Sequence, residues 1–343
     1  MDNNTGTELE QPLISVVIAV YNGQDAVGRA ISSVLRQTHP NIEVVIVDDG
    51  STDNTSRVLE GYEALGRAGR EIRVLRQEHT GRAVARNTAL EVVSGDFITF
   101  LDAEDTLLPH HLGTLLGRYE DVATSESGSR TVVCANAFLC TAGGINAGRL
   151  RYREKLPDVR RQRSVILDRN FGSLYGLFPR YFFAEVGVFD PEQVCVQTWE
   201  LWLRAIYSGW RVDRVEQVTS ITWWSEDSKQ KHQECLAAGE ERALRQTLRR
   251  FDGKLSTRER AAVQRRLKNG SALVAASQAE QALREGRGED AKEHLRRTAE
   301  MMPTQRRVRI QSAIANLPGG TRWLVNRQRA EDRCVGYTEH LQC

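Results

Sequence analysis

The sequence predicts an α/β protein in which a mostly parallel sheet is flanked by helices, followed by an α-helical C-terminal region. Three stretches rich in β-branched or aromatic residues carry no charge and suit strands covered on both faces: Ile14–Val20, Val44–Val47 and Phe97–Leu101. An amphipathic stretch, Asp25–Gln37, follows the first strand and is typical of a helix. Because crossovers between strands are right-handed, this alternating order favours a parallel sheet.

Carboxylates follow the third strand directly, at Asp102, Glu104 and Asp105. Ligands of open α/β sheets bind outside the carboxyl ends of the strands, and Mg²⁺ and Mn²⁺ prefer oxygen ligands that leave room for phosphate. The placement therefore predicts a site for a metal ion and a phosphate-bearing ligand. An isolated acidic turn is more often a solvated turn that caps the next helix. A second acidic strand end upstream argues against that alternative here.

This second strand end is the turn D-D-G-S-T-D at positions 48–53. Gly50 permits a backbone conformation that side chains resist, while Ser51 or Thr52 can cap the helix that follows. Both acidic turns should lie on one edge of the same sheet, because parallel strands end on the same side.

Four motifs in the first 110 or so residues resemble the family 2 glycosyltransferases, which have the GT-A fold. In chain order they are P-L-I-S-V-V-I-A-V-Y-N-G, V-V-I-V-D-D-G-S-T-D, R-Q-E-H-T-G-R-A-V-A-R-N and F-L-D-A-E-D. The resemblance implies transfer of a sugar from a nucleotide diphosphate sugar to an acceptor, usually with inversion and with Mn²⁺ or Mg²⁺. The acceptor class stays open between a glycan, a lipid-linked molecule, a peptide and a small molecule.

The resemblance also assigns nucleotide-binding residues. Tyr21, with Val20 and Asn22 beside it, is expected along the nucleotide. Asp49 is expected to accept a hydrogen bond from a base ring nitrogen, and Arg86 to contact the base. A carboxylate that faces an imide N–H reads uracil or thymine, which points to a UDP- or dTDP-linked donor.

The same family pattern assigns the ribose and metal residues. Asp102, with Ala103 next to it, is expected to bind ribose and to lie at the metal. Glu104 occupies the third position of the family's D-x-D and is expected to ligate the metal. Glutamate keeps the charge of aspartate but adds a methylene, so the coordination geometry is expected to shift.

The sequence departs from the family at the position of the general base. The family places an E-D pair before a helix that reads W-D-L-W-L-R; here the helix starts at Trp199, but the pair is Gln197 and Thr198. Neither side chain is a base near neutral pH. Three explanations stay open: Glu200, Glu192 or another carboxylate substitutes; the acceptor is a better nucleophile or brings its own base; or the chain binds a sugar nucleotide without efficient transfer. In the last case it is a catalytically impaired sugar-nucleotide or glycan-binding scaffold.

Other nucleotide enzymes fit less well. A dinucleotide oxidoreductase needs G-x-G-x-x-G after the first strand, and Val20–Gln24 does not supply it. A sugar nucleotidyltransferase normally has a glycine-rich loop with an arginine and a lysine there, and only Gly23 is present.

Composition suits an enzyme with more than one domain, because the chain has 343 residues and 40% of them are hydrophobic. Residues 1–11 are polar and acidic and are expected to be disordered, and no apolar stretch reaches the length of a transmembrane segment or secretion signal. A cytoplasmic location with reduced thiols is expected, because the cysteines show no zinc spacing: Cys134, Cys140, Cys195, Cys235, Cys334 and Cys343. His110 and His111 are interpreted as the exposed start of a helix.

The chain divides into a GT-A domain over 12–225, with a nucleotide half (12–119) and an acceptor half (120–225), a helical domain over 230–318 and a tail over 319–343. Helices are expected at Glu234–Phe251, Thr257–Glu285 and Glu289–Met302. The pair Leu273–Glu285 and Glu289–Met302 resembles one tetratricopeptide-like hairpin. A single hairpin cannot bury its faces alone, so it should pack on the catalytic domain or form a homodimer.

Charge is uneven along the chain. Residues 235–343 hold 22 basic and 13 acidic residues, and Arg306-Arg307-Val308-Arg309 is the densest basic cluster. A patch for anionic lipid, nucleic acid or an acidic acceptor is one interpretation. Interleaved glutamates favour salt-bridged, solvated helices instead, so no nucleic-acid partner is expected.

Overall fold

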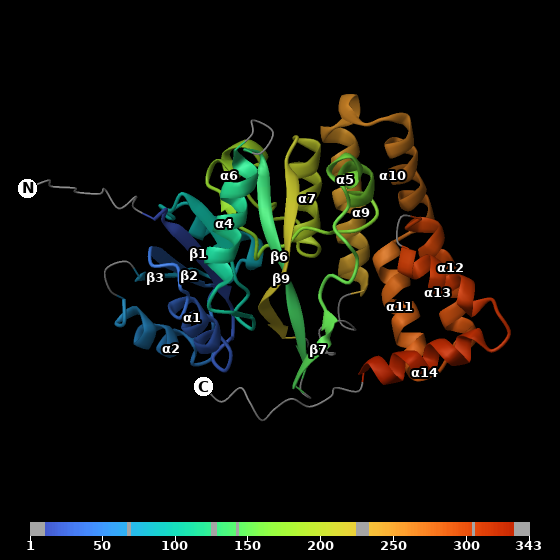
Figure 1. The fold of residues 1–343 in the computed structure, drawn as a ribbon, viewed down its shortest axis with the longest axis horizontal. Helices are drawn as coiled ribbons and strands as arrows, with labels where there is room; N and C mark the ends of the chain where they lie inside the picture. Colours follow the sequence, from blue (N-terminus) through green and yellow to red (C-terminus); the bar gives the residue numbers. More distant parts are fainter. Residues whose placement is uncertain are drawn as a thin grey trace, which may run out of the picture. The chain divides into compact units, whose positions relative to one another are not determined.

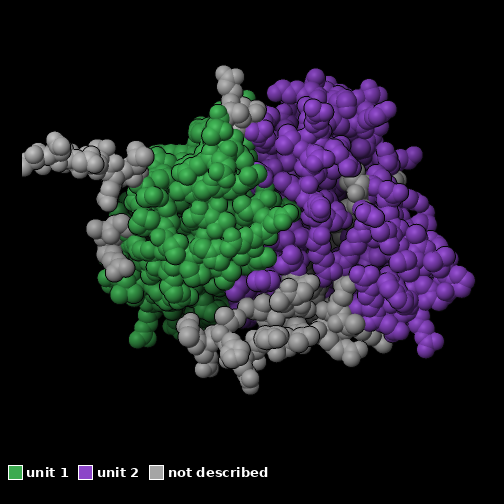
Figure 2. Space-filling view, in the orientation of Figure 1, with its two compact units in different colours: residues 1–135, 174–188, 214–220 green, residues 136–173, 189–213, 221–343 purple. Residues whose placement is uncertain are grey.

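The computed structural model describes residues 11–66, 70–124, 129–141, 144–223, 233–303 and 306–332. The disorder expected for residues 1–11 therefore falls almost entirely outside the described residues. Two compact units are present (Figure 2). Unit 1 holds residues 1–135, 174–188 and 214–220; unit 2 holds residues 136–173, 189–213 and 221–343. Unlike the consecutive domains expected from the sequence, each unit is assembled from separated segments.

Unit 1 contains the predicted parallel sheet, with the strand order β3-β2-β1-β4-β8. The pairs β1–β2, β2–β3 and β1–β4 are parallel, whereas β8 is antiparallel to β4. The register sets Val20 opposite Asp48, so β1 and β2 end side by side at the carboxyl edge. The strands are β1 (Ile14–Val20), β2 (Ile42–Asp48), β3 (Arg70–Arg76), β4 (Phe97–Phe100) and β8 (Phe178–Pro179).

Helices cover both faces of this sheet. The right-handed crossover rule, applied to this strand order, puts α1 and α2 on one face and α3 on the other. Figure 1 shows α1 and α2 side by side. The core is aliphatic, and Val16, Ile18, Val44 and Ile46 have no exposed surface. The helices of this unit are α1 (Val27–Leu35), α2 (Thr55–Glu63), α3 (Arg82–Leu90), α4 (His111–Ala123) and α6 (Tyr181–Val186).

A second sheet has the strand order β5-β9-β6-β7. Its strands β6 and β7 pair antiparallel. The strands are β5 (Thr106–Leu107), β6 (Thr131–Thr141), β7 (Gly144–Leu150) and β9 (Arg211–Trp223).

The C-terminal region is helical, as predicted, but its boundaries differ. The helix expected over Thr257–Glu285 is broken, because Gly270 has a φ of +86° and the Ser271 side chain accepts a hydrogen bond from the backbone of Val274, which caps a new helix. The tail expected from residue 319 is wrong for 320–332, which form α14; residues 333–343 lie outside the described part. The helices of unit 2 are α5 (Val159–Ile166), α7 (Gln197–Tyr207), α9 (Gln233–Arg250), α10 (Thr257–Asn269), α11 (Ala272–Glu285), α12 (Gly288–Met301), α13 (Arg306–Ala315) and α14 (Gly320–Asp332), and the short helix η1 covers Asp252–Lys254.

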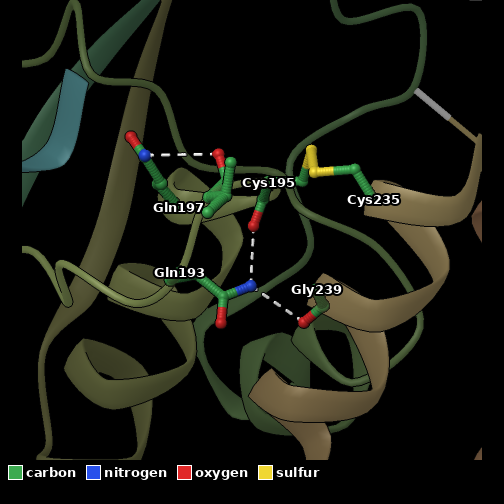
Figure 3. Close-up of a disulfide and its surroundings, with 6 residues drawn as sticks. Gln193, Cys195, Gln197, Cys235 and Gly239 are labelled. Carbon is green, nitrogen blue, oxygen red and sulfur yellow. Dashed lines mark hydrogen bonds between the residues drawn. A yellow bond between two sulfur atoms is a disulfide. The ribbon is translucent and has the colours of Figure 1, made fainter. Parts of the chain in front are cut away.

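Two expectations about single side chains are wrong. Cys195 and Cys235 form a disulfide rather than free thiols (Figure 3). His111 starts α4 as expected but is fully buried, and its Nδ1 lies within hydrogen-bond distance, 2.7 Å, of the Thr219 hydroxyl. No helix among the described residues has the length and apolar composition needed to cross a bilayer.

Candidate functional site

The loops that leave β1 and β2 are joined by hydrogen bonds at the carboxyl edge of the sheet. The backbone N–H of Asn22 donates to Ser51 Oγ at 3.0 Å, and Asn22 Oδ1 accepts from the Thr52 N–H at 2.8 Å. Gly23 N–H donates to Thr55 Oγ1 at 2.8 Å. Ser51 and Thr52 therefore hold the neighbouring loop and do not cap α2, contrary to expectation.

The N-cap residue of α2, Asn54, makes no capping hydrogen bond with its side chain, but the residue before it bonds the first residue of the helix. Asp53 Oδ1 accepts from the backbone N–H of Thr55 at 2.9 Å. Burial raises the pKa of the Asp53 carboxyl, but the Thr55 hydrogen bonds outweigh it and the net pKa is lowered.

Asp49 is 2% exposed and anchors the segment that leads into α3. Its Oδ1 accepts from the Thr80 N–H at 3.0 Å and from Gln77 Nε2 at 2.7 Å, and its Oδ2 accepts from the Gly81 N–H at 2.9 Å. His79 Nδ1 lies 2.9 Å from Oδ2. Asp49 thus already binds several donors of residues 77–81, and a base imide would share Oδ2 with Gly81 or displace His79.

An exposed aromatic pair lies beside Asp49. The rings of Tyr21 and His79 stack with their centroids 3.9 Å apart, and Tyr21 is 46% exposed. Gly50 allows this packing, since its φ is +74° and a Cβ at this position would lie 2.7 Å from the backbone nitrogen of His79. The pair offers a flat apolar face next to hydrogen-bonding groups, which suits a nucleobase.

Arg86 and Asp102 form an ion pair, with Arg86 Nη2 2.8 Å from Asp102 Oδ1. Arg86 is 4% exposed; burial lowers the pKa of its guanidinium, and the Asp102 charge opposes that shift. The Tyr175 hydroxyl donates to Asp102 Oδ2 at 3.0 Å and also bonds Asp105. The arginine of the A-R-N motif is therefore held against the carboxylate that follows β4, and Tyr175, which the sequence reasoning missed, fixes the other side of that carboxylate.

Arg82 is a second arginine at this cluster, also missed from the sequence. It is exposed and precedes Arg86 by one helical turn, so both side chains lie on the same face of α3. The charge of Asp102, and to a smaller extent that of Glu104, raises the pKa of Arg82 above its ordinary value. The i, i+4 spacing of the two arginines was the signal available in the sequence.

The carboxylates differ in their fitness for a metal ion. Asp102 is bound by Arg86 and Tyr175, and Asp105 is buried against Tyr175. Glu104 is exposed and has no hydrogen bond or ion pair to another described residue. No group of three or more possible metal ligands occurs among the described residues. This donor set fits an ion held by one carboxylate and by the phosphates of a ligand, which is a common arrangement for Mg²⁺.

The residues expected to act as the general base lie in unit 2 on α7, whereas the residues above lie in unit 1. Glu200 is 4% exposed and forms a bidentate pair with Arg204, at 2.6 and 2.9 Å. Thr198 lies in the first turn of the same helix. Both oxygens of the Glu200 carboxylate are therefore already engaged by Arg204.

The loop before α7 is attached to α9. Gln193 Nε2 donates to Cys195 O at 2.6 Å and to Gly239 O at 2.8 Å, beside the disulfide (Figure 3). Val196, which joins this loop to α7, has a φ of +55°, an unfavourable conformation for a β-branched residue. Glu192, the other named carboxylate, pairs with Arg242 of α9.

Comparison with known proteins identifies the domain. Residues 15–172 match the family model described as "Glycosyl transferase family 2". These residues form a family 2 glycosyltransferase domain. Since the described sheet and its flanking helices accompany this match, the expected GT-A fold is confirmed.

Curated relatives share parts of this family 2 domain. A stretch of 106 residues is 40% identical to the E. coli UDP-Glc:alpha-D-GlcNAc-diphosphoundecaprenol beta-1,3-glucosyltransferase WfgD, covering 30% of this chain and 40% of that protein. A stretch of 203 residues is 28% identical to an uncharacterized glycosyltransferase of Rickettsia felis, covering 57% of this chain and 31% of that protein. The chain thus spans less than half the length of these relatives.

Among solved structures, residues 1–349 of S. aureus TarS superpose with a TM-score of 0.53 at 17% identity, covering 93% of this chain and 87% of that one. The same TarS fragment, solved in complex with UDP-GlcNAc, gives a TM-score of 0.53 and covers 93% of this chain and 88% of that one. At this identity the likeness concerns the fold.

Proposed function

We propose that the family 2 domain transfers a sugar from a nucleotide diphosphate sugar to an acceptor, with inversion at the anomeric carbon. The observation that carries this proposal is the cluster of Arg82, Arg86, Asp102 and Glu104, which lies at the carboxyl edge where α/β sheets bind phosphate ligands. The relatives support a UDP-linked donor ahead of a dTDP-linked one, since WfgD is named for UDP-Glc and TarS was solved with UDP-GlcNAc. The acceptor stays open between a glycan, a lipid-linked molecule, a peptide and a small molecule.

In this function the nucleotide lies across the loops after β1 and β2. Tyr21, with Val20 and Asn22 beside it, supplies the stacking face for the base. Asp49 accepts from the base imide through Oδ2, and the base takes the place of the His79 ring at that oxygen. Arg86, which is expected to contact the base, pairs with Asp102 and holds that carboxylate in place.

Asp102 and the adjacent Ala103 meet the ribose, and the phosphates lie toward Glu104. Mn²⁺ or Mg²⁺, when bound, stabilises the negative charge that develops on the leaving diphosphate. Glu104 is the residue to hold that ion, with Asp102 beside it. Arg82 faces the same carboxylates and adds a fixed positive charge against the diphosphate. This assignment gives the exposed side chain of Arg82 a role that the sequence did not suggest.

The acceptor hydroxyl loses a proton during transfer, and Glu200 is the carboxylate of α7 closest to the position that Thr198 occupies. To accept that proton, Glu200 has to loosen its pair with Arg204. Arg204→Gln tests this requirement: release of the carboxylate should raise transfer, whereas a purely structural pair predicts only lower stability.

The alternative function is a sugar-nucleotide or glycan-binding scaffold that transfers poorly. Thr198 at the usual base position and the engaged carboxylate of Glu200 favour it. Binding of UDP in the presence of Mn²⁺, without turnover of any UDP- or dTDP-sugar, would decide for this alternative.

The experiment that tests the main proposal is a thermal-shift and turnover screen of UDP, dTDP, GDP and their sugars, with and without Mn²⁺. UDP should raise the melting temperature, because a ligand that binds only the folded state stabilises it. Glu104→Ala should abolish the Mn²⁺ dependence of the shift, whereas Glu91→Ala, an exposed glutamate at the end of α3, should not change it. Full activity of Glu104→Ala would refute the metal assignment, and failure of all nucleotides to bind would refute the site.

A cytoplasmic location and a dimer through the C-terminal helices stay predictions. The Cys195–Cys235 disulfide argues against the first, because disulfides are rare in the cytoplasm. Cell fractionation and sedimentation equilibrium would test the two.

A further inference from the structure

Two arginines of α11 and α12 are paired with acidic neighbours: Arg284 with Glu280 at 3.1 Å, and Arg296 with Glu293 and Glu300 at 2.7 and 2.6 Å. These helices are the solvated, salt-bridged surface that the sequence predicts. The chain from Pro303 to Ala330 is different, since it contains six arginines and no aspartate or glutamate.

This acid-free segment forms α13, a short loop and α14, the red helices of Figure 1. Arg306 and Arg309 of α13 and Arg322 of α14 are exposed, and none of them has an ion pair within the described part of the chain. Their charges are therefore not neutralised by the protein surface around them. Glu331 and Asp332 come only at the last turn of α14.

Large apolar side chains are exposed among these arginines. Ile310 of α13 is 46% exposed, Leu317 of the loop 62% and Trp323 of α14 50%. Arg306, Arg309 and Ile310 follow the i, i+3, i+4 spacing that puts side chains on one face of a helix. The Arg327 guanidinium lies 5.4 Å from the centroid of the Trp323 ring, so cation and aromatic ring share one patch of α14.

One face of α13 and one face of α14 are buried against α11 and α12. Ala315, Leu324 and Val325 are buried with Ala282 and Leu295 of α11 and α12 in one small core. The exposed apolar residues therefore lie outside that core and are not needed to fold the helical region. Exposed tryptophan, leucine and isoleucine cost free energy in water unless something covers them.

We infer that α13, α14 and the loop between them, together called the basic apolar face, bind the surface of an anionic lipid membrane. Arg306, Arg309 and Arg322, which have no ion pair among the described residues, match a negatively charged surface. Apolar residues with a tryptophan insert at the boundary between headgroups and acyl chains. A nucleic acid would match the arginines, but it would leave Ile310 and Leu317 uncovered. The inference does not depend on the proposed sugar transfer.

Flotation of the full-length chain with vesicles tests this inference. Vesicles of phosphatidylcholine with 30% phosphatidylglycerol, about that of an anionic leaflet, are compared with pure phosphatidylcholine. The protein should float with the anionic vesicles and stay behind with the neutral ones, and 0.5 M NaCl, about enough to shorten the Debye length to 4 Å, should weaken binding.

Variants separate the two parts of the face. Arg309→Glu should weaken partitioning by about thirtyfold, because it removes one positive charge and adds a negative one. Trp323→Ser should weaken binding even at low salt. The matched controls are Arg245→Glu in α9, whose partner is Glu241, and Val159→Ser in α5, which is 53% exposed; both should bind as the parent does.

Each variant needs an unchanged far-UV circular dichroism spectrum and melting temperature, so that loss of binding is not loss of folding. Equal flotation with neutral and anionic vesicles would overturn the inference, as would equal loss in the control variants. Retention on heparin and a nucleic-acid column without vesicle binding would overturn it in favour of a polyanion site. Salt-insensitive self-association through Trp323 would overturn it in favour of a dimer surface.

Discussion

Removal of the Cys195–Cys235 disulfide should destabilise unit 2 strongly. The bond links the loop before α7 to the first turns of α9, and the two cysteines are 40 residues apart in the sequence. The perturbation is the double variant Cys195→Ser/Cys235→Ser, because a single replacement would leave one unpaired thiol that can react elsewhere.

The magnitude follows from the length of the closed loop. In the chain-entropy treatment a loop of about 40 residues raises the free energy of unfolding by about 4 kcal/mol at 25 °C. The contacts around the bond keep part of the geometry without it, since Gln193 bridges Cys195 and Gly239, and Arg242 pairs with Asp190 at 3.4 Å. These contacts act on the folded state, whereas the cross-link restricts the unfolded chain, so they do not replace its contribution.

Guanidinium denaturation followed by tryptophan fluorescence measures this change. Trp199, Trp202 and Trp210 are at most 4% exposed and all lie in unit 2, so their emission reports unfolding of that unit. Reduction of the parent protein with dithiothreitol should lower the midpoint as much as the double variant does, and should not affect the variant further. A change below about 1 kcal/mol on reduction, or peptide mapping that finds the two cysteines separately alkylated, would refute the reasoning.

Three further predictions concern buried groups. Gly172→Ala should destabilise by about 3 kcal/mol in thermal unfolding, because a Cβ there would overlap the Trp202 ring, and unchanged stability would contradict that packing. Burial, and then the charge of His110, lowers the pKa of the His111 imidazole to about 3, so between pH 6.5 and 3 the unfolded chain binds a proton that the folded protein does not. As the pH is lowered from 6.5 to 3, the free energy of unfolding should therefore fall by about 1.4 kcal/mol per pH unit. An NMR titration of His111 with a midpoint near 6.5 would contradict this. Arg86→Met and Asp102→Asn should couple by about 2 kcal/mol in a double-mutant cycle of unfolding, and additive effects would mean that the ion pair contributes nothing.

The buried strands could be predicted because most of their residues are β-branched or aromatic. β1, β2 and β4 contain few polar residues, and such segments have few alternatives to a covered sheet. β3 was missed because it reads R-E-I-R-V-L-R, in which only Ile72 is buried. An edge strand with one solvated face carries a weaker signal than a central one. The helix α14 was missed for a related reason, since arginines interrupt its apolar positions.

In the candidate site, residues defined by local sequence could be predicted, whereas contacts between residues far apart in the sequence could not. Positions that follow a strand directly, such as Asp49, Asp102 and Glu104, could be named from the sequence, because a strand and the turn after it are local features. Tyr175 bonds Asp102 across 73 positions and His111 bonds Thr219 across 108, and no local pattern announces either contact.

Arg82 was missed although its relation to Arg86 is local. The two arginines are four positions apart, which is about one helical turn, and this spacing can be seen in the sequence. The resemblance assigns a role to Arg86 and none to Arg82, so attention to the assigned residues alone hides the second arginine. Once α3 is known to begin at Arg82, helix geometry sets both guanidinium groups on the side of Asp102. The helix therefore places the positive charge of Arg82 where the diphosphate is proposed to bind. We expect Arg82→Ala to weaken binding of UDP more than binding of uridine, because uridine has no diphosphate.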